Sequence, residues 1–97
     1  MEEHLNTILE WAARGTLDQF RIEAEARLGD SEYSVEKEDD GLLFYRNRRE
    51  GGFLGIGGRT VQEPVMRLTE TDAGMEIEPE PLDREFVEYL ASGLRAH

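Results

Sequence analysis

One segment near the middle of the chain, residues 49–59, constrains the fold more than any other. It contains five of the ten glycines in the 97-residue chain. Glycine loses more conformational entropy on ordering than any other residue, so a regular helix or strand is disfavoured here. We therefore predict a loop at 49–59 that joins two regular parts of a single domain, 1–97, because a chain of this length supports one hydrophobic core.

Residues 32–48 predict a β-hairpin before this loop. The Asp-Asp-Gly sequence at 39–41 suits a type I turn whose glycine takes the left-handed bulge position. We place Glu38 opposite Leu42, because this register gathers apolar residues of both strands on one face. The same register makes the following pairs: Val35 with Tyr45, Glu32 with Arg48, and Glu36 diagonally with Arg46.

Residues 60–79 predict a second hairpin after the loop. The Asp-Ala-Gly sequence at 72–74 repeats the turn chemistry of the first hairpin. Pro64 has no amide hydrogen to donate, so we expect it at the beginning of a strand or at an edge of the sheet.

Helices are predicted near both ends of the chain, because apolar residues recur there at helical spacing. In residues 2–14 they are Leu5, Ile8, Leu9 and Ala12. In residues 82–96, where Asp83 is a good N-cap, they are Leu82, Phe86, Tyr89, Leu90 and Leu94.

Residues 16–29 fit two patterns. Thr16 and Gln19 form a capping box, which is typical of a helix start. Four apolar residues then share a helical face: Leu17, Phe20, Ala24 and Leu28. Five apolar residues also alternate with charged ones, as in a strand: Phe20, Ile22, Ala24, Ala26 and Leu28. We favour a strand, because five alternations in a row outweigh weak helix propensities.

These elements predict an α+β fold. The expected architecture is an antiparallel β-meander of four to five strands, flanked by an N-terminal and a C-terminal helix. The helices cover one face of the sheet, and the other face is polar.

The formal net charge is −11, from 22 acidic and 11 basic residues. Charge of this sign repels nucleic acid and anionic membranes at long range. Arginine supplies ten of the bases, which favours halophilic adaptation, with a GC-rich genome as the alternative explanation. No apolar run approaches the ~18 residues of a membrane helix. The N-terminus lacks the basic region of a signal peptide, so we expect a cytoplasmic protein.

We expect no catalytic site, no metal and no cofactor. The chain has no cysteine, which excludes a thiol nucleophile and thiolate zinc sites. Its two histidines, His4 and His97, lie near the termini, where no rigid scaffold would position them. The acidic residues do not match the spacing of a calcium-binding loop. The protein is therefore predicted not to be an enzyme.

The segment around the glycine-rich loop is the one place where this acidic chain becomes basic. An apolar centre with a charged rim is typical of a protein interface. The candidate binding residues are Arg46, Arg48, Arg49, Phe53, Leu54, Ile56 and Arg59. The alternative for the arginines is ordinary cross-strand pairing with glutamates of the sheet.

Two local resemblances fall on the same loop. Residues 52–57 resemble the glycine-rich turn in the N-terminal domain of Jag-type RNA-associated proteins, where it joins two strands. Residues 55–59 are similar to the GxxG loop of KH domains, which grips a single-stranded backbone. A KH loop lies between two helices, whereas here a strand is predicted before the loop and Pro64 follows it.

The leading hypothesis is a non-catalytic interaction module that uses the loop at 49–59 to bind a protein partner or a second copy of itself. The alternative is binding of single-stranded nucleic acid through the arginines and Phe53, which the net charge disfavours. A third hypothesis is a small-molecule carrier with an apolar cavity between sheet and helices.

Overall fold

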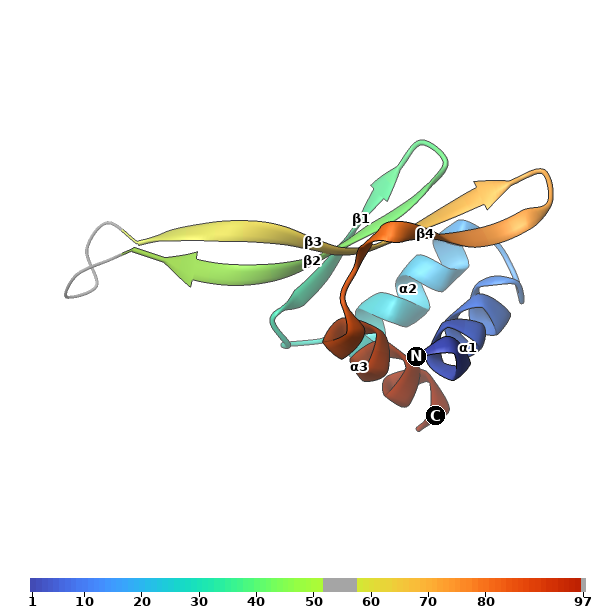
Figure 1. The fold of residues 1–97 in the computed structure, drawn as a ribbon, viewed down its shortest axis with the longest axis horizontal. Coiled ribbons are helices and arrows are strands. Elements are labelled where there is room, and N and C mark those ends of the chain that lie inside the picture. The colour runs from blue at the N-terminus through green and yellow to red at the C-terminus, as the bar shows by residue number, and fades with distance from the viewer. Residues whose placement is uncertain (52–57, 97) are drawn as a thin grey trace.

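Among residues 1–51 and 58–96, which this computed structural model describes, three helices cover one face of a four-stranded antiparallel sheet (Figure 1). The strands pair in the order β1-β2-β3-β4. The predicted α+β meander with terminal helices is therefore confirmed. In chain order the elements are α1 (Glu2–Ala12), α2 (Leu17–Leu28), β1 (Tyr33–Glu38), β2 (Gly41–Glu50), β3 (Arg59–Thr71), β4 (Gly74–Leu82) and α3 (Arg84–Arg95).

The two terminal helices form close to where apolar spacing predicts them. Of the residues predicted for the second helix, however, Leu82 is the last residue of β4 and Tyr89 is 43% exposed. Ile8 and Ala12 of α1 are buried, and Leu5 and Leu9 pack against the core beside them. At the start of α3 the Phe86 backbone N–H donates to the Asp83 carboxylate at 3.2 Å, which confirms the predicted cap. The apolar stripe of each helix faces the sheet and closes one side of the core.

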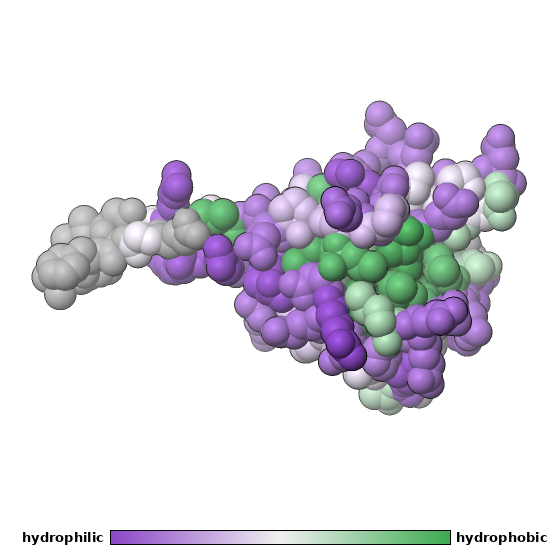
Figure 2. Space-filling view, in the orientation of Figure 1, coloured by the Kyte–Doolittle hydropathy of each residue, from purple (hydrophilic) through white to green (hydrophobic). Residues whose placement is uncertain are grey.

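The hydrophobic core lies between the helices and the inner face of the sheet. At its centre the Phe86 ring lies 5.0 Å from the Tyr33 ring, in the edge-to-face geometry that aromatic pairs favour, and 5.2 Å from the Phe44 ring. Figure 2 shows hydrophobic residues gathered between sheet and helices, while the surface around them is mainly hydrophilic.

Residues 16–29 form the helix α2, so the strand favoured for them is wrong. The capping box is complete, with the Gln19 N–H donating to Thr16 Oγ1 at 3.1 Å and the Thr16 N–H donating to Gln19 Oε1 at 2.9 Å. All four residues of the helical face are buried, whereas Ile22 of the alternating set is 60% exposed. The charged residues between them form pairs four residues apart, Arg21 with Glu25 and Arg27 with Glu23, which stabilise a helix.

The first hairpin is shifted by one residue from the predicted register. Glu38 pairs with Gly41 rather than with Leu42, and Val35 therefore pairs with Phe44. This register buries Leu42 and Phe44 completely beneath the helices. Residues 42–45 are apolar at every position, so their alternation alone could not select the face that enters the core.

Gly41 serves a different purpose from the one predicted. Its φ lies outside the left-handed region, so the predicted bulge conformation is wrong. A Cβ atom at this position would overlap the carbonyl oxygen of Leu68 on β3. Only a residue without a side chain therefore allows β2 and β3 to pair here.

The hairpin of β2 and β3 is longer than its neighbours and projects beyond the rest of the sheet (Figure 1). Its pairing shifts at a β-bulge, where Phe44 faces Met66 but Tyr45 faces Pro64. In the described chain β4 pairs with β3 only from Met66 inward, so Pro64 lies on an edge segment, as predicted. Because the two strands extend to Glu50 and Arg59, the loop is shorter than the predicted 49–59.

The capping box can be tested with two substitutions at one position. Thr16→Ala removes the side-chain acceptor for the Gln19 N–H, and we expect the free energy of unfolding to fall by about 1 kcal/mol. Thr16→Ser keeps the hydroxyl and should stay within a few tenths of a kcal/mol of the wild type. Urea titration followed by circular dichroism measures both. Equal stabilities of the two variants would contradict a structural role for the cap.

Candidate interaction surface

The outer part of the β2–β3 hairpin, which we call the arm, comprises residues 47–50 and 59–63. It extends away from the helices (Figure 1) and makes the molecule elongated, with extents of 49 × 29 × 23 Å. The arm carries three arginines and two glutamates, a net charge of +1, whereas the other residues carry 8 bases and 20 acids, a net charge of −12. The arm is thus a cationic projection on an anionic body.

The structure separates the candidate binding residues into two groups. Arg48, Arg49 and Arg59 lie on the arm and are exposed. Arg46 lies at the root of the arm, on the face of the sheet that the helices cover, and only 14% of its side chain is exposed. The three apolar candidates, Phe53, Leu54 and Ile56, lie outside the described residues.

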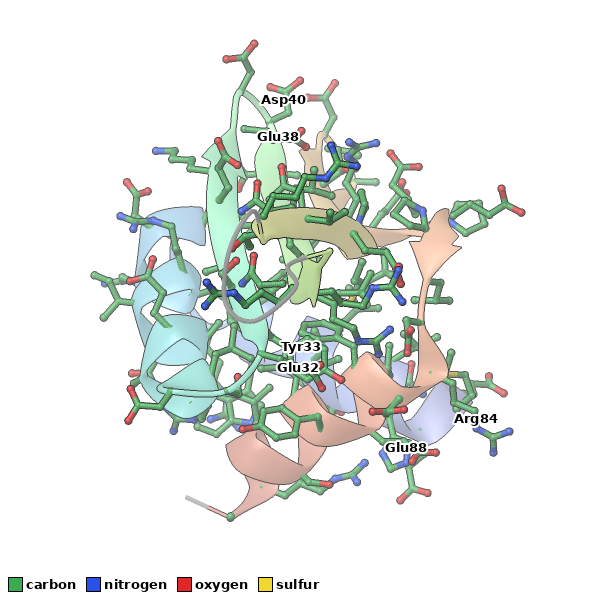
Figure 3. All side chains as sticks on the ribbon, turned by 90° about the vertical axis from the view of Figure 1, so that its left-hand side faces the viewer. Glu32, Tyr33, Glu38, Asp40, Arg84 and Glu88 are labelled. Carbon is green, nitrogen blue, oxygen red and sulfur yellow. The ribbon has the colours of Figure 1, made fainter. Side chains whose placement is uncertain are left out.

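Arg46 links the sheet to the beginning of α3. Its Nη1 atom lies 2.9 Å from the carboxylate of Asp83, the residue that caps α3, and 3.4 Å from the carboxylate of Glu63. Its Nε atom lies 3.8 Å from Glu32, and its Nη2 atom donates to the Tyr33 hydroxyl at 3.3 Å. Figure 3 shows Glu32 and Tyr33 side by side near α3. Arg46 is therefore a structural residue rather than part of an accessible surface.

The predicted partners of the arginines are wrong, because the hairpin register differs. Glu32 contacts Arg46 rather than Arg48, and Arg48 lies 3.5 Å from Glu63 on the neighbouring strand. Cross-strand pairing with glutamates, the alternative considered for these arginines, is therefore found for Arg46 and also for Arg48, which contacts Glu63. For Arg49 and Arg59, exposure on the arm leaves their guanidinium groups accessible to a partner.

The pKa of Asp83 reflects its place in this cluster. Burial alone would raise the pKa, but the hydrogen bonds from Arg46 and from the Phe86 backbone outweigh burial and hold the pKa below its ordinary value of 3.8. The hydrogen bonds of Arg46 with Tyr33 and Asp83 raise the pKa of the guanidinium in turn. Both groups therefore stay charged near neutral pH, and the link persists.

A row of polar side chains fixes the root of the arm on the other, open face of the sheet. The Asn47 amide donates to the Ser34 hydroxyl at 3.0 Å and accepts from the Gln62 amide at 3.4 Å. These bonds connect β1, β2 and β3 at the point where the arm leaves the sheet. Sequence reasoning missed this row, because polar residues on an open face give no signal of their partners until the register is known.

The remaining open face is mainly polar, as expected, although Leu43 also lies on it and is buried. Arg67 on β3 donates two hydrogen bonds to Glu38 on β1, at 2.9 and 3.4 Å, and so bridges over β2. Burial and a hydrogen bond with Glu36 raise the pKa of Tyr45 on this face. These contacts bind charged groups to one another within the sheet.

On the β4 side of the sheet, the edge formed by β4 and the edge formed by residues 59–63 of β3 differ in how they are protected. β4 carries Pro79 and Pro81 within the stretch where its pairing with β3 is irregular, and prolines discourage strand addition. In the part of the chain that is described, no strand pairs with the outer side of β3 at residues 59–63. This segment contains no proline and is an open edge.

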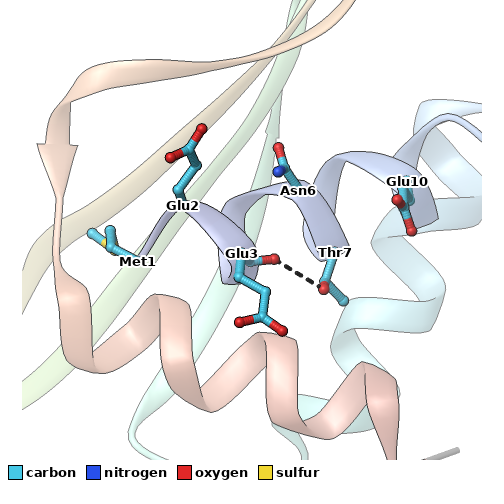
Figure 4. Close-up of a pocket in the computed structure, with 6 residues that line it drawn as sticks. All are labelled: Met1, Glu2, Glu3, Asn6, Thr7 and Glu10. Atoms are coloured by element: carbon cyan, nitrogen blue, oxygen red, sulfur yellow. Dashed lines mark hydrogen bonds between the residues drawn. The ribbon is translucent and has the colours of Figure 1, made fainter.

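A surface hollow of about 590 Å³ lies along α1 (Figure 4). Its lining comes from the first ten residues of the chain and is mainly polar, including the Thr7 hydroxyl that donates to the Glu3 carbonyl at 3.1 Å. A small-molecule carrier requires instead an apolar cavity between sheet and helices. The hollow therefore gives no support to a carrier role.

Comparison with known protein families, with curated proteins and with solved structures finds no match to this chain. Within residues 1–51 and 58–96, no three acidic or histidine side chains gather closely enough to hold a metal ion. None of the helices described is long and apolar enough to cross a membrane.

The link between Arg46 and Asp83 predicts a specific pH dependence. Asp83→Asn keeps a capping side chain but removes the charge, and we expect it to lower the free energy of unfolding by about 1 kcal/mol at neutral pH. Because the folded-state pKa of Asp83 is lowered, its contribution is complete above the unfolded-state value of about 3.9 and is lost as the pH falls through the lower, folded-state value.

Urea unfolding of wild type and Asp83→Asn should therefore give curves that converge at acid pH. Asp72→Asn, at the exposed turn between β3 and β4, is the control and should follow the wild type throughout. A difference between wild type and Asp83→Asn that stays constant into the acid range would contradict the ion pair.

Proposed function

We propose that the protein is a non-catalytic interaction module that binds an acidic, extended segment of a protein partner through the arm. The observation that supports this most directly is the projection of a two-stranded ribbon with exposed arginines from an otherwise anionic body. A two-stranded ribbon is only marginally stable by itself. A projecting ribbon gains stability when a further strand adds to its edge.

The chemistry of the arm defines the partner. Backbone hydrogen bonds along an open strand edge provide affinity for any extended chain, and side chains provide selectivity. Exposed Arg49 and Arg59 favour carboxylates on that chain, because arginine matches the planar geometry of a carboxylate. A basic partner would be attracted to the body rather than to the arm.

Single-stranded nucleic acid is less favoured by the same surface. Such sites combine a positively charged groove with aromatic rings on which bases stack. Phe53, the aromatic residue expected to stack with a base, lies outside the described residues. The body, with a net charge of −12, opposes a polyanion. Nucleic acid is therefore an alternative outcome of the test below rather than the proposal.

The test uses two matched peptides, one alternating valine with glutamate and one alternating valine with lysine. Titration into isotopically labelled protein at low salt, at a concentration where the protein is monomeric, should shift the backbone N–H resonances of the arm with the glutamate peptide alone. Arg49→Glu should weaken this binding by roughly fivefold, since one exposed charge contact is worth up to about 1 kcal/mol.

Arg84→Glu is the matched control, because Arg84 on α3 is 74% exposed and lies outside the arm. It should bind the glutamate peptide like the wild type. A single-stranded oligonucleotide is titrated in parallel. If it binds the arm more tightly than the glutamate peptide does, with an affinity that falls steeply with salt, nucleic acid replaces protein as the partner.

A further inference from the structure

We infer that the open edge of β3 in the arm, residues 59–63, pairs with the same edge of a second copy of this chain in a symmetric antiparallel dimer. This inference deepens the proposed function, since it rests on the arm as a contact surface and names one partner. Its basis is the pattern of charges along the edge.

The edge is complementary to itself in one register. Side chains alternate between faces, so two antiparallel copies keep matching faces together only if odd-numbered residues lie opposite odd-numbered ones. Among these registers, the one centred on Val61 places Arg59 opposite Glu63 of the second copy, and Glu63 opposite Arg59. Registers shifted by two residues place these charges opposite Val61 instead. Opposite charges at directly facing positions stabilise a strand pair.

The side chains needed for this contact are accessible. Arg59, Thr60 and Gln62 are exposed, and Val61 is partly exposed. The Glu63 side chain is 42% exposed and lies between Arg46 and Arg48 of its own chain. A carboxylate has two oxygens that each accept more than one hydrogen bond, so Glu63 can accept a further guanidinium from the second copy.

The other edges of the sheet do not offer the same match. β4 is interrupted by Pro79 and Pro81, which cannot donate to an added strand. β1 carries Glu36 and Glu38 on its open face, so a second copy of β1 would bring further carboxylates to them. The β2 side of the arm, beyond Asn47, also lacks a described strand partner. A register that pairs Arg48 with Glu50, however, sets Arg49 opposite Arg49 of the second copy. The β3 side of the arm combines an absence of proline with opposite charges and no like-charged pair.

The position of the arm also reduces repulsion between copies. Each body carries a net charge of −12, and contact between two bodies is opposed by that charge. Pairing through the arms places the bodies at opposite ends of an extended dimer, beyond the ~10 Å over which charges interact at moderate salt. A five-residue contact is small, so we expect a weak dimer that forms at high protein concentration.

The register is tested by oxidation of single cysteine variants, because the chain has no cysteine of its own. In the proposed dimer Val61 faces Val61 of the second copy, and directly opposed Cα atoms lie about 4.5–5.5 Å apart, within disulfide range. Val61→Cys should therefore form a disulfide-linked dimer readily. Thr60→Cys, which faces Gln62 of the second copy, should form one much more slowly.

The charge pattern is tested by exchange of charges between two variants in sedimentation equilibrium. In a dimer of either variant, Arg59→Glu or Glu63→Arg, residue 59 of one copy faces a like charge at residue 63 of the other. Each variant should therefore raise the dimer dissociation constant about tenfold. An equimolar mixture of the two creates only opposite-charged pairs and should dimerise again. Arg84→Glu, on α3 and outside the arm, is the control and should dimerise like the wild type.

A wild-type protein that stays monomeric at its highest soluble concentration would overturn the dimer, as would equal cross-linking of the two cysteine variants. If Glu63→Arg does not fold, the cysteine pair still decides the register. The outcome is separable from that of the peptide titration, because the two cysteine variants report on pairing between arms with no peptide present. A failure of the titration with an intact dimer would reject the acidic partner alone.

Discussion

Arg46 marks the point where β2 stops being part of the core and becomes part of the arm. Inward of it, Leu42 and Phe44 are fully buried beneath the helices. At Arg46 the same face of the strand meets three carboxylates, including that of the residue that caps α3. A largely buried arginine is stable only when its charge is matched. This cluster therefore fixes α3 to the sheet and lets β2 continue outward without a core beneath it.

Much of the fold follows from patterns that are local in sequence. The places of α1 and α3, the cap at Asp83 and the existence of the two hairpins are predicted correctly, because each depends on residues a few positions apart. The register of the first hairpin is wrong by one residue. The α2 segment was ambiguous, since alternating apolar residues and residues at helical spacing share Phe20, Ala24 and Leu28. In the structure the capping box is complete and the residues at helical spacing are buried, and both features belong to a helix rather than a strand.

The candidate surface was less predictable, because it depends on a register. A shift of one residue moves each side chain of a strand to the other face. Here it brings Arg46, rather than Arg48, into contact with Glu32. Composition located the basic segment correctly but could not show that Arg46 faces the helices while Arg49 faces solvent. That distinction follows from the burial of Leu42 and Phe44, because Arg46 lies on the same face of β2 as these residues and Arg49 on the opposite face.

The length of the hairpin and the chemistry of its edges are separate features that support the same conclusion. A long ribbon without a core is a liability unless its edges are protected or used. Elsewhere this chain protects its edges, with two prolines in β4 and with carboxylates on β1. On the arm it instead places arginine and glutamate four residues apart on an edge without proline. An edge that is unprotected but selective in charge is suited to accept one particular strand and to exclude others.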